Sequence, residues 1–157
     1  MSVAETADNA DVVARPPLLY GAALLVVLAL RSLWPLPIVA PNFARWPGVA
    51  VAVLSLAFGI WGRRTLVAAG TNLDPMRPTT AIVTSGPFRI SRNPLYVALA
   101  LLFLGLSLVF NTTWGLIALF PVLIVMHHGV IRREERYLQQ KFGATYRTYC
   151  GRVRRYL

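Results

Sequence analysis

The chain has 157 residues, a hydrophobic content of 56% and a formal net charge of +10. So apolar a composition over a single-domain length is typical of a membrane protein and excludes an ordinary soluble fold. The one cysteine, Cys150, excludes an intramolecular disulfide and a cysteine-based metal cluster.

Residues 1–17 are polar and include Glu5, Asp8 and Asp11. A cleaved signal peptide begins with basic residues, so this segment does not resemble one. We expect a short, loosely ordered tail, followed by a single integral-membrane domain over residues 18–157.

Four apolar runs follow the tail, each close to the roughly 20 residues that a helix needs to cross a bilayer. In chain order they are Leu18–Trp34, Trp46–Trp61, Leu95–Phe110 and Trp114–Ile131. We therefore predict an all-α membrane protein with about four transmembrane helices.

The second helix is expected to end at about Arg63. Its small residues Ser55, Gly59 and Gly62 favour close packing against a neighbouring helix. The polar connection that follows, residues 64–93, is long for so small a chain and rich in turn-forming residues, which is typical of a functional loop.

The third and fourth helices are predicted to form an antiparallel hairpin, because only Asn111, Thr112 and Thr113 separate them. Pro94 suits the first position of the third helix, where its missing N–H is not needed. This hairpin returns Pro94 and the region His127–Glu135 to the same membrane face.

The last helix is predicted to continue beyond the membrane as an amphipathic helix, since residues 130–142 contain no Gly or Pro. Gly143 suits the left-handed residue that closes it. A further short helix over residues 144–150 would place Tyr146 and Tyr149 on one face.

The positive charge is explained by topology. If the amino terminus is cytoplasmic, all but two of the 16 basic residues, Arg31 and Arg45, fall on the cytoplasmic side. We expect both termini in the cytoplasm, a location in the cytoplasmic (inner) membrane, and no nucleic-acid partner, since anionic lipid headgroups balance the charge.

Glu134 and Glu135 are the chemically most capable pair in this region. Neighbours in a helix point about 100° apart, so the two glutamates cannot both face one ligand equally. Glu135 is expected to form an ion pair either with Arg132 or with a group on the side of the helix that carries Arg136. The alternative is a solvated helix face with weak ion pairs.

His127 and His128 are also adjacent, so they do not converge as the i,i+4 ligands of a helical zinc site do. We expect no metal site here.

Several motifs in order resemble the isoprenylcysteine carboxyl methyltransferase family, which is related to the membrane phospholipid methyltransferases. The matching segments cover more than half of the chain: Val83-Thr84-Ser85-Gly86-Pro87-Phe88, Arg92-Asn93-Pro94-x-Tyr96, Glu134-Glu135-x-x-Leu138, Phe142-Gly143-x-x-Tyr146-x-x-Tyr149 and Val153.

The resemblance implies an S-adenosylmethionine-dependent methyltransferase with an amphiphilic, lipid-like or prenylated acceptor, methylated on a carboxylate oxygen or an amine nitrogen. In such enzymes the glutamate matching Glu134 holds the amino-acid end of the cofactor. The positions implied to complete the cofactor site are Thr80, Ile82, Val83, Phe88, Asn93, Pro94, Tyr96 and, as a further donor, His128.

Arg92, Glu135 and a few neighbouring residues are candidates for the chemistry. Arg92 would complement a carboxylate of cofactor or substrate. A carboxylate acceptor needs no general base, whereas an amine acceptor must lose a proton, for which Glu135, His127 or a tyrosine is a candidate base.

The chain departs from the family pattern at two positions. Asn93 replaces the usual histidine, and Val130 stands where the prenylcysteine enzymes place an arginine for the substrate carboxylate. The second change weakens the case for a prenylcysteine substrate more than the case for the cofactor.

Two other functions stay open. The segment Lys141–Cys150 also resembles the end of NADPH-dependent membrane sterol reductases, although Glu134 and Glu135 favour the methyltransferase because a phosphate-rich dinucleotide prefers arginines. The third possibility is a non-catalytic lipid-binding protein.

Overall fold

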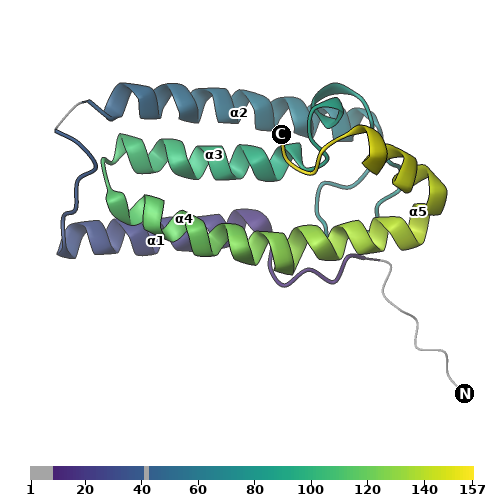
Figure 1. Ribbon diagram of the computed structural model, residues 1–157, viewed down its shortest axis with the longest axis horizontal. Coiled ribbons are helices and arrows are strands. Elements are labelled where there is room, and N and C mark those ends of the chain that lie inside the picture. The colour runs from purple at the N-terminus through teal and green to yellow at the C-terminus, as the bar shows by residue number, and fades with distance from the viewer. Residues whose placement is uncertain (1–8, 41–42) are drawn as a thin grey trace, which may run out of the picture.

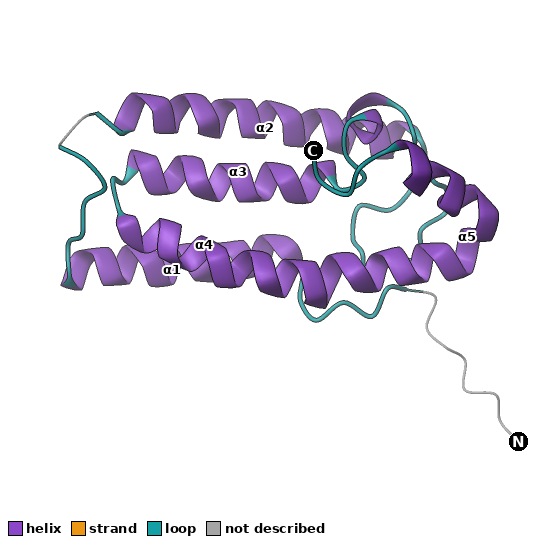
Figure 2. Ribbon diagram, in the orientation of Figure 1, coloured by secondary structure: helices purple, strands orange, loops and turns teal. Residues whose placement is uncertain are grey.

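Four apolar helices pack as a bundle in the computed structural model, which describes residues 9–40 and 43–157 (Figure 1). The described residues contain helices, turns and loops but no strand (Figure 2), which confirms the all-α prediction. The elements in chain order are α1 (Pro16–Leu33), α2 (Arg45–Ala68), the 3-10 turn η1 (Gly86–Arg89), α3 (Pro94–Val109), α4 (Thr113–Val125), the π-helical turn η2 (Met126–Ile131) and α5 (Arg132–Arg152).

The outer surface of the bundle is apolar. α1, α2 and the continuous helix Thr113–Arg152 are long and apolar enough to cross a membrane, and the apolar part of the last ends at Ile131. The fourth apolar helix, α3, has 16 residues, about 24 Å of helix. Large side chains such as Leu25, Leu54 and Phe120 are exposed. The chain is therefore an integral membrane protein.

The α2–α3 contact depends on small residues. A Cβ atom on Gly48 would lie 2.6 Å from the backbone nitrogen of Val109, and one on Gly105 would lie 2.7 Å from that of Ala52. Nearer the C-terminal end of α2, a Cβ on Gly59 would lie 3.3 Å from the Cβ of Ala98. The backbones approach too closely for larger residues, as the sequence predicts for α2.

The predicted hairpin is confirmed. Asn111, at φ +47°, lies in the short link between α3 and α4, and both helices run the length of the bundle side by side (Figure 1). The start of α3 and the turn η2 consequently lie toward the same end of the molecule.

The predicted end of α2 at Arg63 is wrong. The helix continues to Ala68 and is followed by Gly70 at φ +66°. Residues 64–68 contain no Gly or Pro, so nothing in the local sequence stops the helix at the pair of arginines. The polar connection therefore begins near residue 69.

The segment 9–15 is packed rather than loose. Ala10 and Val12 are buried, the Val13 N–H donates to the Gly129 carbonyl at 3.1 Å, and Arg133 donates to the Asp11 carbonyl at 2.8 Å. Residues 1–8 of the expected tail lie outside the described residues.

The amphipathic extension is confirmed as α5, which the chain enters directly from η2. At Gly143 (φ 52°, ψ −119°) the helix bends sharply, and its last part turns back toward the start of α3 (Figure 1). Tyr146 and Tyr149 follow the bend on one buried face, with ring centroids 6.2 Å apart. This reversal encloses the space that forms the candidate site.

Candidate active site

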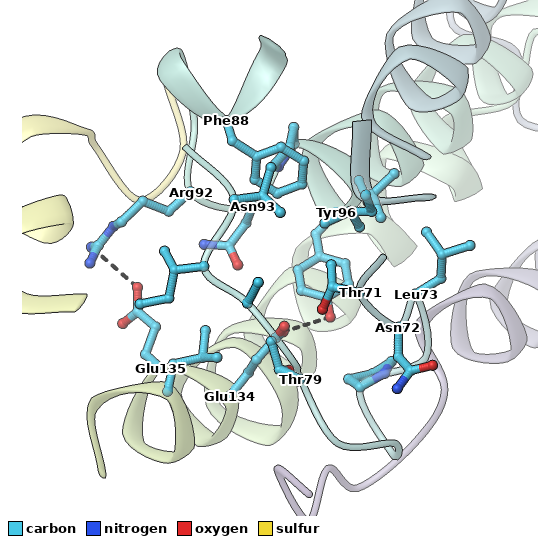
Figure 3. A pocket seen from close by; sticks show the side chains of 18 of the residues that line it. Thr71, Asn72, Leu73, Thr79, Phe88, Arg92, Asn93, Tyr96, Glu134 and Glu135 are labelled. Carbon is cyan, nitrogen blue, oxygen red and sulfur yellow. Dashed lines mark hydrogen bonds and ion pairs between the residues drawn. The ribbon is translucent and has the colours of Figure 1, made fainter. Parts of the chain in front are cut away.

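A cavity lies where the polar connection, the start of α3 and α5 meet. Figure 3 shows Glu134 and Glu135 on one side of it and Phe88, Arg92, Asn93 and Tyr96 across from them. We call it the polar cavity. Its enclosed part measures about 90 Å³. That is smaller than the roughly 300–1,000 Å³ of typical small-molecule sites, so a bound ligand would extend through its open mouth.

Glu134 reaches this cavity from the first turn of α5. Its Oε2 accepts a hydrogen bond of 2.7 Å from the Tyr96 hydroxyl of α3 (Figure 3). Burial raises the pKa of the Glu134 carboxyl, the hydrogen bond from Tyr96 opposes that rise, and the nearby charge of Glu135 adds to it. Glu134 is the carboxylate of this pair that has no cationic partner at ion-pair distance among the described residues.

Glu135 has a different environment. Arg155 donates to both of its oxygens, at 2.7 to 3.1 Å, and Arg92 lies 3.2 Å from Oε1. The predicted pairing with Arg132 or on the Arg136 side is therefore wrong. The bend at Gly143 brings in an arginine 20 residues away, which spacing within one straight helix does not reveal.

Most of the site residues predicted from the sequence line the polar cavity. The members of that set that do so are Ile82, Val83, Phe88, Arg92, Asn93, Pro94, Tyr96, Glu134 and Glu135. Two do not. The Thr80 hydroxyl is exposed and donates to the Gly70 carbonyl at 3.0 Å, and His128 is exposed on η2.

Other lining residues were not expected from the sequence. Thr71, Asn72 and Leu73 come from the turn after α2, and Thr79 donates its N–H to the Tyr137 hydroxyl at 3.2 Å. The turn-forming composition predicted a structured connection. It did not identify which part of the connection folds over the cavity.

A second, larger cavity of about 600 Å³ lies among α1, α2 and α3. Its lining is mainly apolar and includes Leu56, Ile60, Leu99 and Leu102. We call it the apolar groove. A volume of this size and character is typical of a site for an apolar ligand.

The two cavities share one stretch of wall, which we call the neck. It consists of Leu73, Asp74, Pro75, Leu95 and Tyr96, each of which lines both cavities. A ligand in the apolar groove would therefore reach toward the polar cavity past the ring of Tyr96.

Asp74 is the charged residue of the neck. Its Oδ1 accepts a hydrogen bond of 3.0 Å from the Met76 N–H, and its Oδ2 lies 3.2 Å from the Arg15 guanidinium. The side chain of Arg15 is 56% exposed, against 27% for Asp74. Exposed ion pairs contribute about 0–1 kcal/mol, so Arg15 can leave Asp74 at little cost.

His127 and His128 are not among the residues that line the polar cavity. His127 Nδ1 is 2.5 Å from the Tyr156 hydroxyl, and its ring stacks edge-on against His128. Over the described ranges, no group of three or more His, Cys, Asp or Glu side chains converges on a common point.

The fold and the site define an all-helical integral membrane protein with a polar cavity and an apolar groove that meet at a neck. The model of the phospholipid methyltransferase family matches residues 43–145, more than half of the chain. The chain belongs to the phospholipid methyltransferase family, and that membership indicates a membrane methyltransferase.

Two curated proteins are similar to parts of the chain. The cobalt-zinc-cadmium resistance protein CzcN of Cupriavidus metallidurans is 33% identical over 103 residues, which are 63% of this chain and 47% of that protein. An uncharacterized protein of Haemophilus influenzae is 35% identical over 63 residues, which are 40% of this chain and 100% of that protein. The match thus spans about half the length of the Cupriavidus relative.

Proposed function

We propose that the protein is an S-adenosylmethionine-dependent methyltransferase that binds its cofactor in the polar cavity and a membrane amphiphile in the apolar groove. The observation that carries this proposal is the neck, where Asp74 and Tyr96 line both cavities. It would bring the head of an amphiphile next to a cofactor while the hydrocarbon stays in an apolar environment.

The chemistry of the polar cavity suits this cofactor. Its sulfonium and ammonium groups need an anion, which Glu134 supplies, and its adenosine needs apolar walls such as Ile82, Val83 and Phe88. Its carboxylate needs a donor. Arg92 Nε is buried and has no hydrogen-bond partner, and such a group is costly unless a ligand satisfies it.

When bound, S-adenosylmethionine supplies an electrophilic methyl group for in-line displacement. The protein's part is then to position the acceptor and to exclude water. Tyr96 and Leu95 at the neck would align the acceptor. Glu135 would hold Arg92 rather than act as a base, because its oxygens already accept from two arginines.

Of the two acceptor chemistries, the neck favours an amine. Two carboxylates, Asp74 and Glu134, line the polar cavity together with Tyr96, and they would attract an ammonium group and repel a carboxylate. The ammonium would displace Arg15 from Asp74. Asp74 would then accept the proton that the nitrogen must lose before its lone pair can attack the methyl group.

Calorimetry in detergent with S-adenosylmethionine, S-adenosylhomocysteine and NADPH tests the cofactor. We expect the two adenosyl compounds to bind and NADPH not to bind. Tight binding of NADPH without binding of the adenosyl compounds would contradict the proposal and favour the sterol-reductase alternative.

Substitution of the two glutamates should have opposite effects on cofactor affinity and on stability. Glu134→Gln removes the anion that faces the cofactor, so it should weaken binding more than Glu135→Gln. Glu135→Gln leaves Arg155 and the largely buried Arg92 without their carboxylate, so it should lower the unfolding midpoint more. Equal or reversed losses of affinity would place the cofactor on the other face of α5.

The acceptor is tested with hexadecylamine and palmitic acid in nanodiscs and a cofactor labelled in its methyl group. Methyl esters release labelled methanol in base, whereas methylated amines do not. We expect base-stable label on the amine. Transfer to palmitic acid alone would contradict the assignment of Asp74 but not that of the cofactor.

We also propose that the polar cavity faces the cytoplasm, as the distribution of basic residues favours. A reporter attached after Leu157 should be found in the cytoplasm. A reporter on the opposite side would overturn this orientation.

A further inference from the structure

The segment 153–157, which follows α5, is bound to the residues that begin α3. The Arg92 N–H donates to the Arg154 carbonyl at 2.9 Å, and the Asn93 side chain donates to the Arg155 carbonyl at 3.0 Å. The Ser91 hydroxyl donates to the same carbonyl at 3.3 Å. Since Arg92 and Asn93 line the polar cavity, this segment supports one of its walls.

The Arg155 side chain makes a second connection. Its guanidinium donates to both oxygens of Glu135, whose side chain is only 14% exposed, and Arg92 approaches the same carboxylate at 3.2 Å. Two guanidinium groups thus share one carboxylate. The cluster of Arg92, Glu135 and Arg155 keeps a net charge of one positive unit, and its members Arg92 and Glu135 line the polar cavity (Figure 3).

Because Arg92 and Arg155 share the Glu135 carboxylate, Arg92 is only partly neutralised. A carboxylate with a single arginine partner neutralises that arginine, whereas the bidentate contact with Arg155 takes up both oxygens of Glu135. Arg92 then retains attraction for another anion, and its buried Nε has no hydrogen-bond partner.

We propose that Arg155 is a positioning residue that keeps Arg92 available to bind the carboxylate of the cofactor. This inference rests on the proposed function. Arg155 is not among the residues that line the polar cavity, so it acts through Glu135 and Arg92.

The test compares S-adenosylmethionine with decarboxylated S-adenosylmethionine, which keeps the sulfonium and the ammonium but lacks the carboxylate. Arg155→Gln should lower the affinity for S-adenosylmethionine by roughly tenfold or more, the range for losing one member of a close charge cluster. The affinity for the decarboxylated compound should change by less than about twofold, because that compound makes no contact with Arg92.

Three further variants make the test specific. Arg154→Ala is the matched control, since the exposed Arg154 contributes only its backbone carbonyl, and it should leave both affinities unchanged. Arg155→Lys restores the charge and should retain most of the preference for the carboxylate. The double variant Glu135→Gln/Arg155→Gln leaves Arg92 as the one charge of the cluster and should recover the preference.

The double variant also covers the case in which Arg155→Gln does not fold, because it leaves no buried carboxylate with a missing partner. Equal losses for both ligands in Arg155→Gln, or no preference in the double variant, would overturn the proposal. If neither ligand binds the unaltered protein, the proposed function itself fails.

Discussion

The Tyr96 hydroxyl donates a 2.7 Å hydrogen bond to Glu134 across the polar cavity, joining α3 to α5 (Figure 3). The tyrosine also lines the apolar groove. One side chain therefore contacts both the carboxylate assigned to the cofactor and the space assigned to the acceptor. The experiments on Tyr96, Glu134 and the apolar groove separate these two roles.

Tyr96→Phe keeps the ring at the neck and removes the donor. Hydrogen bonds to charged groups are worth about 1.5–3 kcal/mol, so the ionised form of Glu134 should become harder to populate. We expect weaker binding of S-adenosylmethionine at neutral pH, on the order of tenfold, measured by calorimetry. Unchanged affinity would show that Glu134 does not depend on this contact.

The affinity for S-adenosylmethionine should depend on pH through Glu134. Burial raises the pKa of this carboxyl, and the form proposed to bind the cofactor is the ionised one. Affinity should therefore fall as pH decreases, beginning at a higher pH than for an ordinary glutamate. Glu134→Gln should lack this dependence, and in Tyr96→Phe the fall should begin at a still higher pH.

The apolar groove should control the acceptor and not the cofactor. Leu56 lines the groove at 49% exposure, so Leu56→Trp should narrow it without disturbing the core. Labelled methyl transfer to hexadecylamine should fall several-fold, the order expected for filling a pocket with a large side chain. Binding of S-adenosylhomocysteine should not change.

A control for this variant lies on the same helix. Leu54 is 69% exposed and does not line the groove. Leu54→Trp should therefore preserve transfer. A similar loss in both variants would mean that the tryptophan acts through the lipid surface and not through the groove.

The α2–α3 interface gives a prediction about stability. Gly48→Ala would place a Cβ 2.6 Å from a backbone nitrogen of α3, whereas a Cβ at Gly21 of α1 would meet nothing within 4 Å. Gly48→Ala should lower the unfolding midpoint in detergent, at a cost of about 1–3 kcal/mol. Gly21→Ala should be neutral or stabilising by up to about 1 kcal/mol.

The sequence was informative where a pattern is local. Apolar runs and a short link predicted the hairpin, and Gly143 predicted the end of the first part of α5. Arg63 and Arg64 suggested the end of α2, but a pair of arginines marks the end of an apolar run and not the end of a helix, which here extends to Ala68.

The site was harder to predict because its decisive contacts join distant residues. Arg155 meets Glu135 only after the chain reverses at Gly143, and Arg15, just before α1, meets Asp74 in the polar connection after α2. The sequence around Asp74 predicted only a turn before Pro75 and did not indicate that this residue lines the site. Glu134 was favoured over Glu135 because the family resemblance implies that the matching glutamate holds the cofactor.

The turn η2 (Met126–Ile131) runs directly into α5, whose first turn carries the two glutamates. A π-helical turn is wider than an α-helical one and takes up about one additional residue. A relative that lacks one residue in this turn would thus present its glutamate pair to the cavity from an ordinary α-helix. Alignments of such chains should place their gap within residues 126–131, and an alignment without it would match Glu134 to the wrong neighbour.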